Sequence, residues 1–345
     1  MKALFIKSPG HTEIGRIARP EPGPGEVLLR VRMVGLCGSD INTYRGRNPL
    51  VELPRIPGHE IAATIEAAGE GVPAGFRRGL SVTLSPYTAC GTCPSCRRGR
   101  PNACRANQTL GVQRDGALTE YIVAPWQKLV EAPGLSLREL CLVEPLSVGF
   151  HAAARGRVGE ADTVAVLGCG AVGLGAVAGA AFRGARVIAV DIDDTKLAVA
   201  RKAGAKESIN PSSAPLDQRL RELTAGDGPG VVIEAVGSPP TFRAAVEMVA
   251  FTGRVVYIGY AKEPVTYETK LFVQKELDIL GSRNALVEDF KDVVRMLTAG
   301  RFPVEETISR VVPVESAGEA FADWDRNPAA FTKILVEVGG SGETQ

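Results

Sequence analysis

This chain has almost no excess of charge of either sign, few histidines and no long apolar run. Its 345 residues include 40 basic and 39 acidic side chains, so the net charge of +1 favours neither a nucleic acid nor an anionic membrane as partner. No uninterrupted apolar run reaches the roughly 18 residues of a membrane span, and the N-terminus lacks the apolar segment of a secretory signal. We therefore expect a cytoplasmic protein that acts on small molecules.

Cysteine occurs seven times, an odd number. Cytoplasmic thiols stay reduced, and clustered cysteines there bind metal more often than they form disulfides. One Gly/Pro/Arg-rich loop holds Cys90, Cys93, Cys96 and Cys104. This spacing predicts a closed, tetrahedral structural zinc site, with disulfides or coincidence as the alternatives. Cys141 and Cys169 are expected to be small buried side chains.

The apolar pattern changes along the chain. Up to about residue 145, short β-like runs such as 26–31 and 80–84 alternate with Gly/Pro clusters, which predicts a β-rich domain. From about residue 160, apolar strands alternate with Ala-rich helices, the pattern of a parallel sheet wound with helices. The expected strands are 163–167, 186–190, 231–236 and 254–258, and the expected helices are 171–183, 194–203 and 241–250. We assign the tail to the β-rich domain, with a helix over 287–298, an extended run around 308–312, a helix from 316 and a strand over 333–338.

A glycine-rich turn follows the 163–167 strand. It reads Gly168-Cys169-Gly170-Ala171-Val172-Gly173. Glycines at such a turn let a dinucleotide pyrophosphate approach the backbone N–H groups of a helix N-terminus. Asp191 ends the next strand, where a carboxylate can accept both ribose hydroxyls of NAD and repel the 2′-phosphate of NADP. The prediction is NAD binding; the alternatives are a turn that binds nothing and an Asp191 that only caps its strand.

Potential ligands for a second metal are scattered. Cys37 and His59 each lie in a Gly-bounded loop, and Glu60 and Glu144 add carboxylates. Separately, a cysteine or histidine is more often a packing residue, but together these four form the mixed ligand set of an open catalytic zinc. The other two histidines are expected outside any site, with His11 exposed and His151 packed in a helix.

The chain resembles, end to end, the zinc-containing medium-chain alcohol and polyol dehydrogenases. The motifs 37–40, 58–60, the four-cysteine lobe, 115–121 and the dinucleotide turn appear in family order. The segment 144–149 resembles the sorbitol and L-threonine dehydrogenase branch, and 281–284 resembles L-galactonate/L-gulonate and idonate-type 5-dehydrogenases. The resemblance implies an α/β protein with a Rossmann doubly wound parallel-sheet domain at 148–283. A β-rich GroES-like catalytic domain would comprise 1–147 and 284–345.

The resemblance also implies roles for single residues. Cys37, His59 and Glu60 would bind the catalytic zinc, with Glu144 as a fourth ligand or as a partner of zinc-bound water. Ser39 would lie beside the reacting hydroxyl, and Asp40 would orient His59 through its second ring nitrogen. Asn42 stands where many relatives have a proton-relaying histidine, so proton release is expected through Ser39, the cofactor ribose and water.

The implied reaction is hydride transfer between NAD(H) and a secondary hydroxyl of a sugar acid or polyol, with two zinc ions per chain. Arg283 would pair with a substrate carboxylate, although a backbone carbonyl, a cofactor phosphate or another subunit are alternative partners. An anionic group of the substrate could also contact Arg45, Arg47, Arg55 or Arg114. The alternative functions are L-threonine 3-dehydrogenase, a simple alcohol dehydrogenase and a non-catalytic cofactor-binding protein. We expect a homodimer or homotetramer, formed through residues 254–279.

Overall fold

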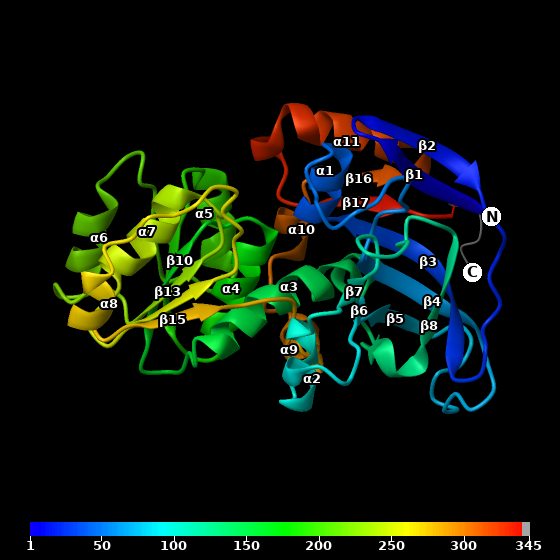
Figure 1. The fold of residues 1–345 in the computed structure, drawn as a ribbon, viewed down its shortest axis with the longest axis horizontal. Helices are drawn as coiled ribbons and strands as arrows, with labels where there is room; N and C mark the ends of the chain where they lie inside the picture. Colours follow the sequence, from blue (N-terminus) through cyan, green and yellow to red (C-terminus); the bar gives the residue numbers. More distant parts are fainter. Residues whose placement is uncertain (340–345) are drawn as a thin grey trace. The chain divides into compact units, whose positions relative to one another are not determined.

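The computed structural model describes residues 1–339, and their contacts divide the chain into two compact units (Figure 1). The first unit comprises Met1–Glu144 and Val304–Gln345, and the second comprises Pro145–Pro303. Helix α9 (Val287–Thr298) therefore groups with the second unit, whereas the tail from residue 284 was expected in the β-rich domain. One buried contact within this unit joins Asp289 of α9 to His151, whose Nδ1 atom lies 2.8 Å from the Asp289 carboxylate.

The second unit is built on a six-stranded parallel sheet. Its strand order is β12 (Glu207–Ile209), β11 (Arg186–Val190), β10 (Thr163–Leu167), β13 (Val231–Glu234), β14 (Arg254–Tyr257) and β15 (Asp278–Gly281). The inner strands are buried almost throughout, as expected for a parallel sheet covered by helices on both faces. The chain extends the sheet first to one side of β10 and then to the other, so β10 lies at a topological switch point, where ligands bind in such folds.

Three of the connecting helices are those that the sequence pattern predicts. They are α4 (Ala171–Phe182), α5 (Asp194–Lys202) and α7 (Pro239–Met248). The pattern did not reveal α6 (Leu216–Leu223) and α8 (Lys270–Gln274). The apolar sides of α6 and α7 pack on one face of the sheet through Leu220, Ala245 and Val246. Helix α3 (Leu137–Arg155) precedes β10 and contains the buried His151, as predicted.

The first unit is built on a seven-stranded mixed sheet. Its path is β16 (Arg310–Pro313), β17 (Ile334–Glu337), β3 (Glu26–Leu36), β4 (Glu60–Ala68), β5 (Ser81–Leu84) and β9 (Leu129–Glu131), and β8 (Tyr121–Pro125) pairs with β3. Strand β17 is parallel to β16 and antiparallel to β3. Residues near the C-terminus thus complete a sheet that the N-terminal half begins.

Smaller elements surround this sheet. They are β1 (Lys2–Ser8), β2 (His11–Arg16), β6 (Tyr87–Thr88), β7 (Gln108–Thr109), α1 (Gly38–Tyr44), α2 (Pro94–Arg97), α10 (Val304–Thr307) and α11 (Ala317–Arg326). Tyr44 of α1 stacks on Phe321 of α11 with ring centroids 5.4 Å apart. His11 is exposed, as predicted. Among residues 1–339, no helix combines the length and apolar character needed to cross a membrane.

Candidate active site and metal centres

The four-cysteine loop brings its sulfur atoms together. Cys93 Sγ lies 3.4 Å from Cys96 Sγ and 3.8 Å from Cys104 Sγ, and Cys104 Sγ lies 3.5 Å from Cys90 Sγ. Zinc–sulfur bonds of about 2.3 Å in a tetrahedron separate sulfurs by about 3.8 Å. All seven cysteines are free thiols, so no disulfide competes. The donor set and its spacing fit a structural zinc.

Local hydrogen bonds already favour a thiolate at Cys93, whereas burial raises the pKa of Cys96 to about 12. The Ser95 hydroxyl and backbone amides of Cys96 and Arg105 lower the pKa of Cys93 to about 5. A thiolate is the form of cysteine that binds metal, so this sulfur is prepared to bind zinc at neutral pH.

A second cluster forms where β3 meets β4. Cys37 follows β3, His59 precedes β4 and Glu60 begins it, and the antiparallel register pairs Gly35 with Glu60. One ligand atom from each of Cys37, His59 and Glu60 lies within 4.8 Å of the others. A thiolate, an imidazole and a carboxylate this close fit the ligand set of an open zinc site.

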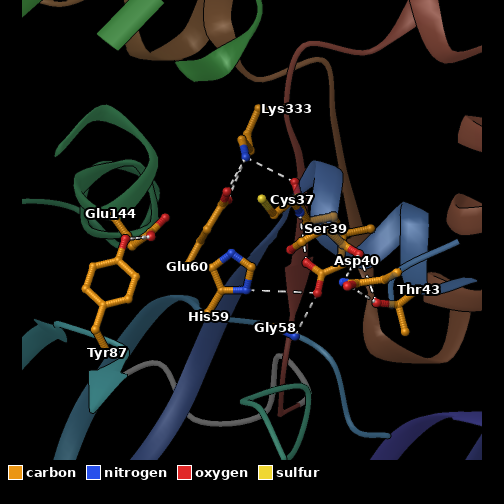
Figure 2. A network of polar contacts seen from close by, with 12 residues as sticks. Cys37, Ser39, Asp40, Thr43, Gly58, His59, Glu60, Tyr87, Glu144 and Lys333 are labelled. Carbon is orange, nitrogen blue, oxygen red and sulfur yellow. Dashed lines mark hydrogen bonds and ion pairs between the residues drawn. The ribbon is translucent and has the colours of Figure 1, made fainter. Parts of the chain in front are cut away.

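Asp40 links the two loops that carry these candidate ligands (Figure 2). Its Oδ2 accepts a hydrogen bond from the Cys37 amide at 2.9 Å, and its Oδ1 accepts one from the Gly58 amide at 3.3 Å. The expected hydrogen bond to His59 is not made, because Oδ1 lies 4.0 Å from Nδ1. The carboxylate is held by two backbone amides and lies at ion-pair distance from the ring, so it orders the loops and faces the imidazole (Figure 2).

Charges around His59 act on its protonation. Burial by itself would lower the pKa of His59, but the neighbouring Cys37, Asp40 and Glu144 outweigh burial and raise it well above its usual value. The surroundings of His59 are therefore rich in negative charge.

Lys333 is a site residue that the sequence analysis missed. Its buried Nζ lies 2.6 Å from both carboxylate oxygens of Glu60 and donates to the Leu36 carbonyl at 3.0 Å (Figure 2). Burial raises the pKa of Glu60 to about 7, and the Lys333 charge opposes the shift. Glycine at position 35 makes room for this carboxylate, because a Cβ there would lie 2.0 Å from Glu60 Oε2.

Glu144 is held by a second missed residue. The phenol of Tyr87 donates a short hydrogen bond to Glu144 Oε1, and both side chains are buried. Glu144 is not part of the Cys37–His59–Glu60 ligand cluster, although its charge acts on His59 and Glu60. Burial, followed by the charge of Glu144, raises the pKa of Tyr87 well above its usual value, so the phenol stays protonated.

Ser39 presents an unused hydroxyl on the same helix as Asp40. Its Oγ is buried without a hydrogen-bond partner, while its carbonyl accepts from Thr43 Oγ1 at 2.9 Å. A buried hydroxyl without a partner is costly and is a ready acceptor or donor for a ligand. Asn42 lies half-buried on this helix.

The glycine-rich turn lies between β10 and α4, where the sequence places it. A Cβ at Gly173 would lie 1.9 Å from the Gly168 carbonyl oxygen, so only glycine allows this close packing of helix on turn. Asp191 follows β11 and its carboxylate accepts from the amides of Cys169 at 2.7 Å and Asp193 at 3.0 Å. These bonds hold the carboxylate beside the turn that would bind the pyrophosphate.

The arginines considered for substrate binding differ in their partners. Arg45 pairs with Asp325 and Arg55 pairs with Asp115, while Arg47 is exposed. Arg283 is half-buried just beyond the carboxyl end of β15. Arg114 forms no side-chain hydrogen bond or ion pair with the rest of residues 1–339, a feature taken up below.

Known proteins match the chain over nearly its whole length. Residues 23–134 match the alcohol dehydrogenase GroES-like domain, and residues 171–299 match the zinc-binding dehydrogenase family. L-galactonate-5-dehydrogenase of Escherichia coli (strain K12) is 32% identical over 321 residues, which cover 93% of this chain and 94% of the relative. The chain belongs to the zinc-dependent alcohol and polyol dehydrogenase family.

Two further relatives agree. Sorbitol dehydrogenase of Halalkalibacterium halodurans is 31% identical, over 94% of both chains. An alcohol dehydrogenase of E. coli CFT073, crystallised with NADH, superposes with a TM-score of 0.90 at 31% identity, over 98% of this chain and 99% of that one. The predicted α/β fold with GroES-like and Rossmann-type parts is confirmed. The protein is a zinc-dependent, NAD-linked dehydrogenase of the polyol and sugar-acid type.

Proposed function

We propose that this dehydrogenase oxidises a secondary hydroxyl of a sugar acid, of the L-galactonate, L-gulonate or idonate kind, with NAD as acceptor. The observation that carries the chemistry is the cluster of Cys37, His59 and Glu60, whose ligand atoms lie within 4.8 Å of one another. When bound, zinc lowers the pKa of a coordinated hydroxyl, and NAD accepts the hydride.

Each residue near the cluster has a distinct task in this proposal. Cys37, His59 and Glu60 hold the metal, and Glu144 is a fourth ligand or the acceptor for its bound water. Ser39 Oγ, buried and without a partner, would accept the proton of the reacting hydroxyl while its own proton passes to the cofactor ribose and water. Asp40 fixes the positions of Cys37 and Gly58 through its two backbone hydrogen bonds.

The cofactor is bound by the second unit in this proposal. The turn from Gly168 to Gly173, including Gly170, Ala171 and Val172, offers backbone N–H groups to the pyrophosphate at the start of α4. The Asp191 carboxylate accepts hydrogen bonds from the ribose hydroxyls and selects NAD over NADP by repelling a 2′-phosphate.

Two observations favour a sugar acid over a neutral polyol. Arg283 follows the carboxyl end of a strand in the parallel sheet, the end at which ligands bind in such folds. One of the similar proteins is named L-galactonate-5-dehydrogenase, and its name is the second support. Oxidation of L-threonine or of a simple alcohol remains the alternative substrate class.

A substrate screen tests the proposal directly. Zinc-replete enzyme with NAD is incubated with aldonates, polyols, L-threonine and short alcohols, and NADH formation is followed by absorbance. The expected result is the highest kcat/KM with an aldonate. Faster oxidation of L-threonine or of a short alcohol would contradict it, and no reduction with any substrate would favour a non-catalytic cofactor-binding protein.

We also propose a homodimer or homotetramer formed along β15. This strand ends the six-stranded order, and Asp278, Ile279 and Gly281 are exposed. An unpaired edge strand is a ready template for pairing with another copy of the chain. Light scattering that gave the mass of one 36.4 kDa chain would contradict the proposal.

A further inference from the structure

Arg114 carries a charge that no other described residue neutralises. Its Nε is buried without a hydrogen-bond partner, and within residues 1–339 the side chain forms no ion pair. Asp115, its neighbour in the chain, is already engaged, because its Oδ1 lies 3.2 Å from Arg55 and accepts from the Ile56 amide at 3.1 Å. Burial lowers the pKa of Arg114 without any compensating acid.

The loop that carries Arg114 is anchored directly beside a proposed zinc ligand. The Gly116 amide donates to the Ile56 carbonyl at 2.7 Å, and the Ala117 amide donates to the Gly58 carbonyl at 2.9 Å. Gly58 immediately precedes His59. Arg114 therefore extends from a loop whose base is fixed to the loop that presents the imidazole.

A second cation lies near Arg114. Lys128 Nζ donates to the Tyr87 carbonyl oxygen at 2.7 Å, and the Tyr87 phenol donates to Glu144. Burial lowers the pKa of Lys128, and the charge of Arg114 lowers it further. Lys128, like Arg114, forms no ion pair among the described residues. Since an ammonium has three donors, at least one remains for a ligand.

We propose that Arg114 and Lys128 together bind an anionic group of the substrate, a carboxylate or a phosphate, while its hydroxyl reacts at the cluster of Cys37, His59 and Glu60. This inference rests on the proposed function and names the residues that would select an acidic substrate. Two cations without an acid are costly to hold together in a half-buried place, and a bound anion offsets that cost.

The two cations differ in what they contribute. A guanidinium offers a planar fork that matches a carboxylate or a phosphate with two parallel hydrogen bonds. An ammonium is a compact charge that adds attraction without a preferred plane. Arg114 would therefore set the orientation of the substrate, and Lys128 would add affinity.

Steady-state kinetics with three substrates tests this proposal. L-galactonate, sorbitol 6-phosphate and sorbitol are compared in the wild type and in the Arg114→Gln and Lys128→Gln variants. Arg114→Gln should lower kcat/KM for the anionic substrate on the order of 100-fold, mainly through KM, and Lys128→Gln should lower it less. Sorbitol should change less than about threefold in both variants. A loss of kcat/KM for L-galactonate identifies a carboxylate as the bound group, and a loss for sorbitol 6-phosphate identifies a phosphate.

Controls separate this proposal from the proposed function and from misfolding. Arg77→Gln removes an exposed arginine of the same unit, to which no role is assigned, and should leave all three kcat/KM values unchanged. Isothermal titration of inorganic phosphate should show binding that Arg114→Gln abolishes, a result independent of turnover. If the wild type does not oxidise L-galactonate, the sugar-acid proposal fails. The measurements with sorbitol 6-phosphate and inorganic phosphate still test whether Arg114 and Lys128 bind an anion. Equal losses on all substrates, or an acid-specific loss in Arg283→Ala alone, would overturn it.

Discussion

Lys333 Nζ lies 2.6 Å from both carboxylate oxygens of Glu60, and both side chains are buried. The pair joins the start of β17 to the start of β4, and Lys333 also donates to the last residue of β3. Burial opposes the charge of Lys333, but Glu60 and Cys37 outweigh it and raise the pKa of the lysine. The ion pair thus fixes the position of the Glu60 carboxylate, a proposed zinc ligand.

Replacing Lys333 by Met should destabilise the protein strongly. Glu60 would lose its buried counter-charge, so the free energy of unfolding of the metal-free protein should fall by about 3–5 kcal/mol, measured by chemical denaturation. Lys333→Arg, which keeps the charge, should lose less. Lys2→Met removes an exposed partner of Glu315 and should cost under about 1 kcal/mol. A loss in Lys333→Met no larger than in Lys2→Met would show that the pair contributes little.

Replacing Cys96 by Ser should remove the metal of the four-cysteine loop. Zinc content, measured by plasma emission spectroscopy, should fall by about one equivalent per chain, and the melting temperature should fall, because a structural zinc contributes to folding. Cys141→Ala is the matched control, since Cys141 is a buried free thiol outside both clusters. Unchanged stability together with loss of turnover would mean that the two metal sites have been assigned the wrong way round.

Replacing Asp191 by Ala should narrow the preference for NAD over NADP. The change removes the negative charge that would repel a 2′-phosphate, while the next residue, Ile192, is 73% exposed and offers no charge to replace it. The ratio of kcat/KM for the two cofactors gives the result. Asp191→Asn, which keeps an oxygen acceptor for the Cys169 amide, separates the charge from the loop geometry. A wild type that prefers NADP would refute the assignment.

Replacing Arg283 by Ala tests the proposed contact from the second unit. If Arg283 pairs with the substrate carboxylate, kcat/KM should fall for L-galactonate by about 2–5 kcal/mol in transition-state free energy, with a small effect on sorbitol. Losses of similar size on both substrates would make Arg283 a hydroxyl ligand or a structural residue. Combined with Arg114→Gln, the result shows which arginine recognises the acid.

Local patterns predicted much of the second unit. The bounds of β10 and β11 agree with the structure, and α4, α5 and α9 differ by at most the end residue. The periodicity of apolar residues in these strands and helices is visible within a few residues of sequence, so they can be recognised without knowledge of distant contacts. The sequence pattern did not predict strand β12 and helix α6, because both are short and largely polar.

The sequence by itself determined the four-cysteine loop, the glycine turn and the ligand types, because each is written within a short segment or matches a family motif. Only the tertiary structure decided which groups hold those ligands in place. Lys333 is 273 residues from Glu60, and Tyr87 is 57 residues from Glu144. Such partners are chosen by strand register and by the burial of charge, and neither leaves a periodic signal in the chain. The isolation of Arg114 is likewise a property of its surroundings, visible only once the neighbouring Asp115 is seen to bind Arg55 and the Ile56 amide.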